Sequence, residues 1–148
     1  MILITAVGCA FCAFCESERV FILCDPRTPV NVRASPKKGT DIVGRLDFGD
    51  WIETDGEERN GFLHVYGIGE AGEGWLYSGY VVEDQPHKVE RWAYVDATGR
   101  VKSYRWIGGK RLKWLTVGSR VKVYGRSEEW AVTNKGYVRT AYLEWGSD

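Results

Sequence analysis

The sequence predicts an all-β protein of two tandem small barrels that follow an apolar, signal-like N-terminal segment. A pattern of glycine, aromatic residue, four residues and tyrosine occurs twice, from Gly74 to Tyr80 and from Gly136 to Tyr142. The 18 glycines and abundant aromatic residues suit short twisted strands and tight turns. The 148 residues fit one domain or two small ones, and the repeat favours two.

The N-terminal residues 1–15 resemble a secretory signal peptide. Residues 2–15 carry no charge, and this run is too short to span a bilayer comfortably. Ala13 and Cys15 suit a cleavage site before Glu16. No Lys or Arg precedes the apolar run, so an atypical signal and a start further upstream both stay open. We expect an exported protein with no stable membrane span, in which residues 16–28 form a linker.

All four cysteines lie near this segment, at positions 9, 12, 15 and 24. The first three have a spacing known from iron–sulfur proteins, which makes a metal or redox protein a remote alternative. Eight residues separate Cys15 from Cys24, whereas the bacterial ferredoxin pattern has three. We therefore expect no cofactor and no metal ligand, and only Cys24 remains if cleavage follows Cys15.

Residues 29–84 predict the first barrel. Val30 and Val32 alternate as in a half-buried strand, and further apolar runs occupy 42–46, 51–54, 62–65 and 74–77. Asp55-Gly56 and Asn60-Gly61 are turn signals between them. Five short strands with such turns are typical of a small barrel.

Residues 89–145 repeat this plan after a connection at 85–88. Residues 115–123 match 46–54, and 136–143 match 74–81. The second copy is shorter mainly because it lacks the glycine-rich loop at 67–73. Variation in a loop between similar strands is expected of a duplicated module.

Three motifs of the first copy, at 30–36, 49–53 and 74–81, resemble the bacterial SH3 (SH3b) family. The resemblance covers about residues 29–83. The second copy resembles the family in its middle and end but departs from it at 100–105. The resemblance implies a binding or targeting module that holds a secreted protein at the cell wall or docks peptide-like ligands.

The two halves carry opposite charge although the whole chain is neutral. Residues 25–86 contain 6 basic and 12 acidic residues, and residues 87–148 contain 13 basic and 6 acidic residues. The surfaces either attract each other or give the second module an anionic partner. The first reading supports an alternative function, in which the modules pack together or oligomerise.

No catalytic constellation is evident in the sequence. The histidines are His64, within a predicted strand, and His87, in the connection. A Cys/His peptidase needs a thiolate beside a histidine, and every cysteine lies at the N-terminus. We expect no enzyme and interpret His64 as an ordinary strand residue.

Candidate ligand-binding residues come from exposed aromatic and basic positions, since binding grooves combine rings with a few polar groups. Tyr77 shares a strand face with Trp75, which we expect in the core. By the resemblance, Tyr80 and Tyr142 line SH3-like grooves, with packing at the barrel end as the alternative. The predicted set is Trp51, Tyr77, Tyr80, Trp106, Lys110, Arg111, Trp114 and Tyr142.

Four of these candidates, Trp106, Lys110, Arg111 and Trp114, fall in the segment 104–114, which mixes basic and aromatic residues. Such a segment suits binding of an anionic wall polymer. The alternative is a solvated loop with two structural tryptophans. Export argues against nucleic acid. The sequence thus predicts a secreted, non-catalytic protein that recognises cell-wall peptide or polymer, or a protein partner. We expect the basic second module to be the preferred place for an anionic ligand.

Overall fold

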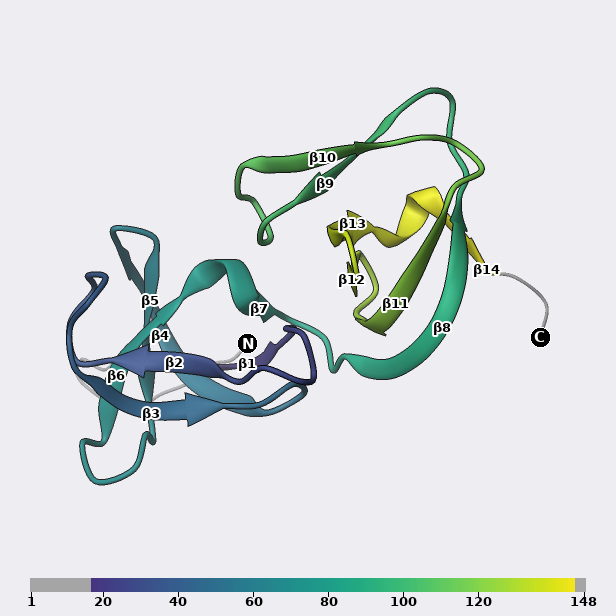
Figure 1. Ribbon diagram of the computed structural model, residues 1–148. Helices are drawn as coiled ribbons and strands as arrows, with labels where there is room; N and C mark the ends of the chain where they lie inside the picture. The colour runs from purple at the N-terminus through teal and green to yellow at the C-terminus, as the bar shows by residue number, and fades with distance from the viewer. Residues whose placement is uncertain (1–16, 146–148) are drawn as a thin grey trace.

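The computed structural model describes residues 17–145, which form two antiparallel sheets of seven strands each (Figure 1). The first has the order β3-β2-β6-β5-β4-β1-β7, and the second has the order β10-β9-β13-β12-β11-β8-β14. Each strand of the second sheet is therefore the counterpart of the strand seven places earlier. The prediction of an all-β fold with two small barrel-like modules is confirmed. Residues 1–15, with the predicted signal and three of the cysteines, lie outside the described residues.

Module 1, residues 17–86, contains one strand that the sequence did not predict. Residues 16–28 were expected to be a linker, but Glu18–Ile22 within them forms β1, which pairs with β4 and β7. Val20 and Ile22 point into the core, and this alternation is the signal of the strand. The other elements are β2 (Val30–Arg33), β3 (Ile42–Leu46), β4 (Trp51–Arg59), β5 (Phe62–Tyr66), β6 (Glu73–Tyr77), the 3-10 turn η1 (Ser78–Tyr80) and β7 (Val81–Val82).

Module 2, residues 87–145, begins with β8 and repeats the order of elements. Strand β8 starts at His87, two residues before the expected boundary of the second barrel. The elements are β8 (His87–Val95), β9 (Val101–Tyr104), β10 (Arg111–Leu115), β11 (Arg120–Arg126), β12 (Trp130–Thr133), β13 (Gly136–Arg139), η2 (Thr140–Tyr142) and β14 (Leu143–Trp145). Among the described residues, no helix has the length and hydropathy of a membrane span.

Each module has its own apolar core, and the longer loop of module 1 contributes to one of them. Inward-facing residues such as Val32 and Leu76 in module 1 and Val123 in module 2 are fully buried. Ile68, from the glycine-rich loop, is also buried in the core of module 1. A Cβ on Gly44 would lie 2.5 Å from its Cγ2 atom, so the missing side chain makes room for this loop.

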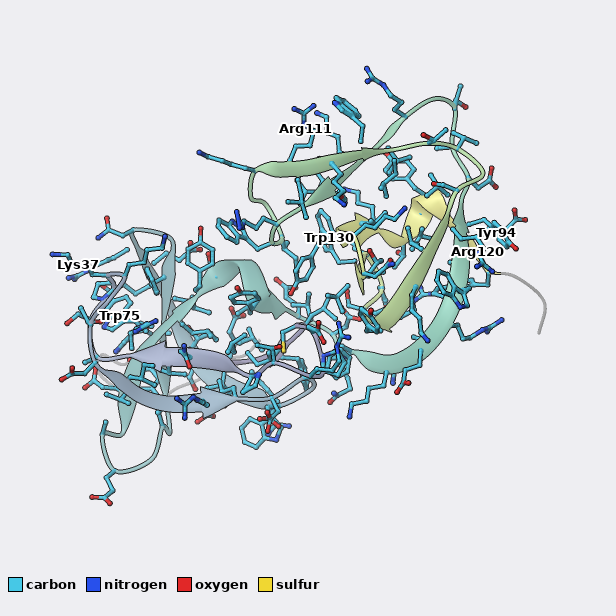
Figure 2. All side chains as sticks on the ribbon, viewed as in Figure 1. Lys37, Trp75, Tyr94, Arg111, Arg120 and Trp130 are labelled. Atoms are coloured by element: carbon cyan, nitrogen blue, oxygen red, sulfur yellow. The ribbon has the colours of Figure 1, made fainter. Side chains whose placement is uncertain are left out.

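A third apolar cluster joins the two modules and includes Trp130, which is labelled in Figure 2. Leu23 and Val82 of module 1 are buried against Trp130, Val132 and Tyr137 of module 2. The Tyr137 hydroxyl donates a hydrogen bond of 2.6 Å to the Leu23 carbonyl oxygen. Burial raises the pKa of Tyr137, which keeps this donor protonated. Apolar packing and hydrogen bonds therefore dock the modules.

Candidate ligand-binding grooves

A groove of about 930 Å³ lies where module 2 meets the end of module 1. We call it groove 1. Module 1 contributes the start of β2, the β2–β3 loop, the β4–β5 turn and η1. Module 2 contributes Arg105 and Trp106, which follow β9. Groove 1 is thus a composite site, formed mainly by module 1 and completed by two residues of module 2.

Aromatic rings form one wall of groove 1, and Tyr77 is at their centre. Its ring lies 5.4 Å from the ring of Phe62, 6.1 Å from that of Tyr80 and 4.9 Å from that of Trp106, with edge-on geometry in each case. Edge-to-face contacts are favourable and fix the orientation of the rings. Burial raises the pKa of Tyr80, so its hydroxyl is a protonated donor at neutral pH. Three of the predicted site residues therefore meet in one preformed wall.

Two glycines create the space that Trp106 occupies. A Cβ on Gly79 would lie 2.8 Å from atoms of the Trp106 side chain, and a Cβ on Gly109 would lie 2.1 Å from its Nε1 atom. The Ile107 N–H donates a hydrogen bond of 3.0 Å to the Gly79 carbonyl oxygen. Ala141 of module 2 occupies the position equivalent to Gly79. The space for a tryptophan beside the 3-10 turn therefore exists at η1, where the residue is Gly79, and is reduced at η2, where it is Ala141.

The charged side chains among the residues that line groove 1 are all basic. They are Arg33, Lys37, Lys38 and Arg105. The first three are half of the six basic residues between 25 and 86, a segment that is acidic overall. Arg33 donates to the Thr40 carbonyl oxygen at 2.9 Å, which orients its guanidinium, and Lys37 lies at the outer edge of module 1 (Figure 2). This local concentration of positive charge suits an anionic group.

A smaller groove of about 590 Å³, groove 2, occupies the same place on module 2. Tyr142 of η2 takes the position of Tyr80, and Arg139 takes the position of Tyr77. Trp114 of β10 also lines groove 2. Cations surround its ring, with Arg100 at 4.3 Å, Arg111 at 4.8 Å and Lys102 at 5.7 Å from the ring centre.

The remaining predicted site residues lie outside the lining of both grooves. Trp51 is 50% exposed, but the Arg19 guanidinium lies 3.9 Å from its ring centre. Module 2 has the same pair in reverse, with Arg120 at the position of Trp51 and stacked on Trp92 at 4.3 Å. The exchange indicates that this stacking covers the outer face of the sheet. Lys110 ends the β9–β10 turn and Arg111 begins β10, where its guanidinium lies 4.8 Å from the ring centre of Trp114 in groove 2.

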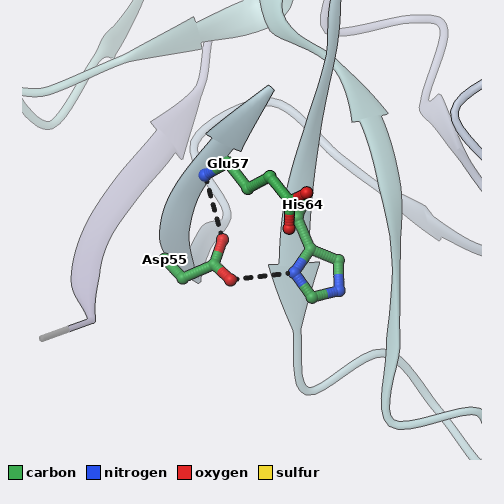
Figure 3. Close-up of side chains that lie close together, drawn as sticks. All are labelled: Asp55, Glu57 and His64. Atoms are coloured by element: carbon green, nitrogen blue, oxygen red, sulfur yellow. Dashed lines mark hydrogen bonds and ion pairs between the residues drawn. The ribbon is translucent and has the colours of Figure 1, made fainter. Parts of the chain in front are cut away.

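A polar cluster around His64 is the main feature that the sequence did not predict (Figure 3). His64 Nδ1 lies 3.1 Å from Asp55 Oδ2, and its Nε2 atom lies 2.6 Å from Glu73 Oε1. Tyr66 donates its hydroxyl to Asp55 at 2.7 Å, and the Glu57 N–H donates to the same carboxylate at 3.0 Å. His64 and Tyr66 lie on the same face of β5, opposite Asp55 on β4. This alternation could have indicated the cluster from the sequence, but Asp55-Gly56 also has the pattern of a turn.

The electrostatics of this cluster favour a charged imidazolium. Burial lowers the pKa of His64, but its hydrogen bonds to Glu73 and Asp55 outweigh burial and raise it. Burial raises the pKa of Asp55, but the Glu57 N–H, Tyr66 and His64 outweigh that effect and lower it to about 2. The cluster therefore behaves as a hydrogen-bonded ion pair.

The same side chains have the residue types of a metal site. One ligand atom each from Asp55, Glu57 and His64 lies within 4.8 Å of the others. Both ring nitrogens of His64 already face carboxylates, and both oxygens of Asp55 face donors. These contacts account for the arrangement without an ion.

Trp75 covers the His64 cluster instead of filling the core. Its ring lies 4.7 Å from the imidazole, while Leu76, on the opposite strand face, is fully buried. The expectation that Trp75 packs in the core is therefore wrong. The strand alternation placed Trp75 and Leu76 on opposite faces, and the smaller residue fills the interior because this thin core is already closed by aliphatic side chains.

Cys24, the one cysteine within residues 17–145, is buried and unreactive in character. Its thiol donates to the Thr28 carbonyl oxygen at 3.6 Å. Burial, with smaller contributions from Asp25, Asp47 and Asp50, raises the pKa of the Cys24 thiol to about 12. A thiolate is the reactive and metal-binding form, so this position suits packing.

Comparisons with known proteins show only distant likenesses. No family model matches the chain. No curated protein matches it either. Among solved structures, NlpC1 from Trichomonas vaginalis is similar at 17% identity over 91% of this chain and 48% of that chain, with a TM-score of 0.40. NlpC2 from the same organism is similar at 16% identity over 90% of this chain and 50% of that chain, with a TM-score of 0.39.

The chain thus spans about half the length of these structures. At such TM-scores the likeness carries no argument about fold or activity. The bacterial SH3 resemblance stays a prediction from sequence motifs.

Proposed function

We propose that the chain is an exported, non-catalytic binding protein whose groove 1 holds a peptide-like ligand with a free carboxylate, such as a peptide of the bacterial cell wall. The observation that carries this proposal is the composition of groove 1. It combines a wall of packed aromatic rings with four basic side chains, and acidic side chains are absent from its described lining.

The chemistry of groove 1 fits such a ligand on two grounds. Arginine and lysine form charge-assisted hydrogen bonds with carboxylates, and these are about twice as strong as neutral ones. Rings already fixed by their neighbours lose little freedom when a ligand binds, which preserves affinity. The wall peptide as ligand rests on the resemblance of residues 29–83 to bacterial SH3 modules.

A binding role is also favoured over catalysis by the state of the reactive groups. Within residues 17–145, the Cys24 thiol is buried with a raised pKa, and His64 is engaged by two carboxylates. Neither side chain lines groove 1. The nucleophile and base of a hydrolase require the opposite, an accessible and activated pair.

Calorimetric titration with a short peptide in two forms tests the proposal. One form has a free C-terminal carboxylate and the other a C-terminal amide. We expect the free acid to bind more tightly, and Tyr77→Ala to weaken it roughly tenfold, a loss of about 1.4 kcal/mol. Trp51→Ala is the matched control, because Trp51 is an exposed ring outside both grooves. Equal binding of acid and amide, or equal losses in the two variants, would contradict the proposal.

A second candidate function is an interaction protein in which the modules themselves assemble. The apolar cluster between Leu23 and Trp130 shows that docking surfaces exist on this fold. Light scattering in low and high salt distinguishes this candidate. A mass that changes with salt, without any peptide binding, supports assembly, whereas a constant mass with binding supports groove recognition.

A further inference from the structure

We infer that groove 2 is a second oxyanion site, and that grooves 1 and 2 together hold one extended acidic chain at two of its carboxylates. This inference rests on the function proposed for groove 1 and extends it to a bivalent ligand. It assigns a role to the basic residues of module 2 that groove 1 does not use.

The equivalence of the two grooves is the first support. Val30 and Val101 are paired with Leu46 and Leu115 in matching registers, and each valine lines the groove of its module. Groove 2 keeps the tyrosine of the 3-10 turn but replaces Tyr77 with Arg139. The aromatic ring of Tyr77 in groove 1 is thus replaced by the guanidinium of Arg139 in groove 2.

The charge of groove 2 is the second support. Among the described residues that line it, the charged side chains are Arg100, Lys102 and Arg139. All three are basic: Arg100 directly precedes β9, Lys102 lies on β9, and Arg139 ends β13. Arg139 also stacks on Trp130 at 4.7 Å, which limits its motion. Arg139 is also paired with Glu129 at 3.4 Å, so Arg100 and Lys102 supply the cations of groove 2 that suit a carboxylate.

Strand β9 connects the two grooves. Lys102 and Tyr104 on β9 line groove 2, whereas Arg105 and Trp106 directly after it line groove 1. Extended backbone rises about 3.3 Å per residue, so the Cα atoms of Lys102 and Tyr104, which share one face of β9, are separated by roughly 7 Å, and Trp106 of groove 1 follows two residues later. An extended peptide of a few residues covers that distance. One ligand chain can therefore occupy both grooves.

The surroundings of Trp114 favour an acidic peptide over single-stranded nucleic acid. Non-specific binders of single strands expose ring faces on which bases stack. The Arg100 and Arg111 guanidiniums lie 4.3 and 4.8 Å from the centre of the Trp114 ring, where a base would have to lie. Trp114 thus holds cations in place for an anion instead of offering a stacking platform.

Bivalent binding has a measurable signature. The second contact of a tethered ligand is intramolecular, so the affinity of a two-site ligand exceeds that of a one-site ligand without any new type of contact. The probes are a peptide with one acidic cluster and a peptide with two copies of that cluster joined by a short flexible linker. We expect the two-cluster peptide to bind the full chain at least about tenfold more tightly.

The double variant Lys102→Ala, Arg139→Ala tests groove 2. Both side chains are exposed, so the fold should tolerate their removal. We expect it to abolish the gain from the second cluster and to leave one-cluster binding at groove 1 unchanged. The matched control is Lys88→Ala, Lys113→Ala, which removes the same charge from exposed positions outside both grooves.

The inference is overturned if the two-cluster peptide shows no gain, or if the control variant loses the gain as fully as the groove 2 variant. Tighter binding of a single-stranded oligonucleotide of equal charge would also overturn it. Failure of groove 1 is separate, because it appears as one-cluster binding that Tyr77→Ala does not weaken.

Discussion

The outer face of β4, β5 and β6 around His64 is polar in module 1, whereas its counterpart in module 2 is apolar and docked. The strand registers equate Asp55, His64, Glu73 and Trp75 with Tyr124, Val132, Lys135 and Tyr137. Val132 and Tyr137 are buried against module 1, whereas His64 is bound to carboxylates. One fold therefore presents either a docking face or a charged one.

The surface of module 1 that contacts module 2 also differs from its counterpart on module 2: it is apolar, whereas the counterpart is acidic. Leu23 and Val82, which receive module 2, correspond to Asp96 and Glu144. Backbone bonds support the match, because Leu23 N donates to Tyr80 O and Asp96 N donates to Tyr142 O, both at 2.8 Å. A head-to-tail contact between similar units can continue indefinitely unless the ends differ. The acidic Asp96 and Glu144 at the equivalent positions of module 2 are less suited than Leu23 and Val82 to an apolar contact of the same kind.

Leu23→Asp is expected to have the largest effect. It gives the docked face of module 1 the aspartate that module 2 has at the equivalent position, Asp96. An uncompensated buried charge costs about 3–5 kcal/mol. Urea unfolding should show this loss of stability, together with weaker peptide binding at groove 1. The reverse exchange, Asp96→Leu, changes an exposed position and should shift stability by about 0.5 kcal/mol or less. Similar losses in the two variants would contradict the asymmetry.

Gly79→Ala should have the next largest effect. Its Cβ would lie 2.8 Å from the Trp106 side chain, so Trp106 must move away from groove 1. Overpacking of this kind costs about 1–3 kcal/mol. The paired variant Ala141→Gly, at the equivalent place in module 2, should cost less than about 1 kcal/mol. Thermal unfolding and peptide titration measure both, and unchanged binding by Gly79→Ala would refute the composite groove.

Tyr137→Phe should have a smaller effect, because it removes one hydrogen bond and keeps the ring. The Leu23 carbonyl oxygen loses its donor at 2.6 Å, which costs about 0.5–1.5 kcal/mol. Urea unfolding should show this loss. The exposed Tyr94→Phe is the control, and equal stability of the two variants would argue against a docking role for the hydroxyl.

His64→Val introduces the residue type of module 2 and tests the charged face by pH. The folded pKa of His64 is raised above 6.5, so its contribution to stability is complete below pH 6.5 and declines as pH rises through the folded value. Asp55, lowered to about 2 from 3.8, contributes above pH 3.8 and loses its contribution as pH falls toward 2. We expect a weaker decline above pH 6.5 in the variant, by urea midpoints across pH. Parallel curves would exclude the ion pair.

The sequence was sufficient to predict features that depend on local pattern. Alternating valines and repeated turn glycines identified two β modules, and the Gly-aromatic motif identified Tyr77, Tyr80 and Tyr142 near grooves. Strand β1 was missed because polar residues 16–19 follow an apolar run, so the alternation of Val20 and Ile22 looked too brief. The pattern of a single strand is readable only when its neighbours do not obscure it.

Features that depend on tertiary contacts were beyond the sequence. The basic segment 104–114 was treated as one surface, but docking divides it, with Trp106 in groove 1 and Trp114 in groove 2. The expectation that module 2 is the preferred place for an anionic ligand stays a prediction. His64 found partners nine residues away on either side through strand pairing, which no local pattern reveals.

The central claim is that docking of module 2 completes a ligand groove on module 1 through Trp106. A nitrogen–proton NMR titration of the full chain tests it most directly, because each tryptophan indole gives its own signal. We predict that a peptide with a free carboxylate shifts the indole signal of Trp106 and leaves that of Trp51 in place. An unmoved Trp106 signal, or equal movement of the two, would contradict the claim.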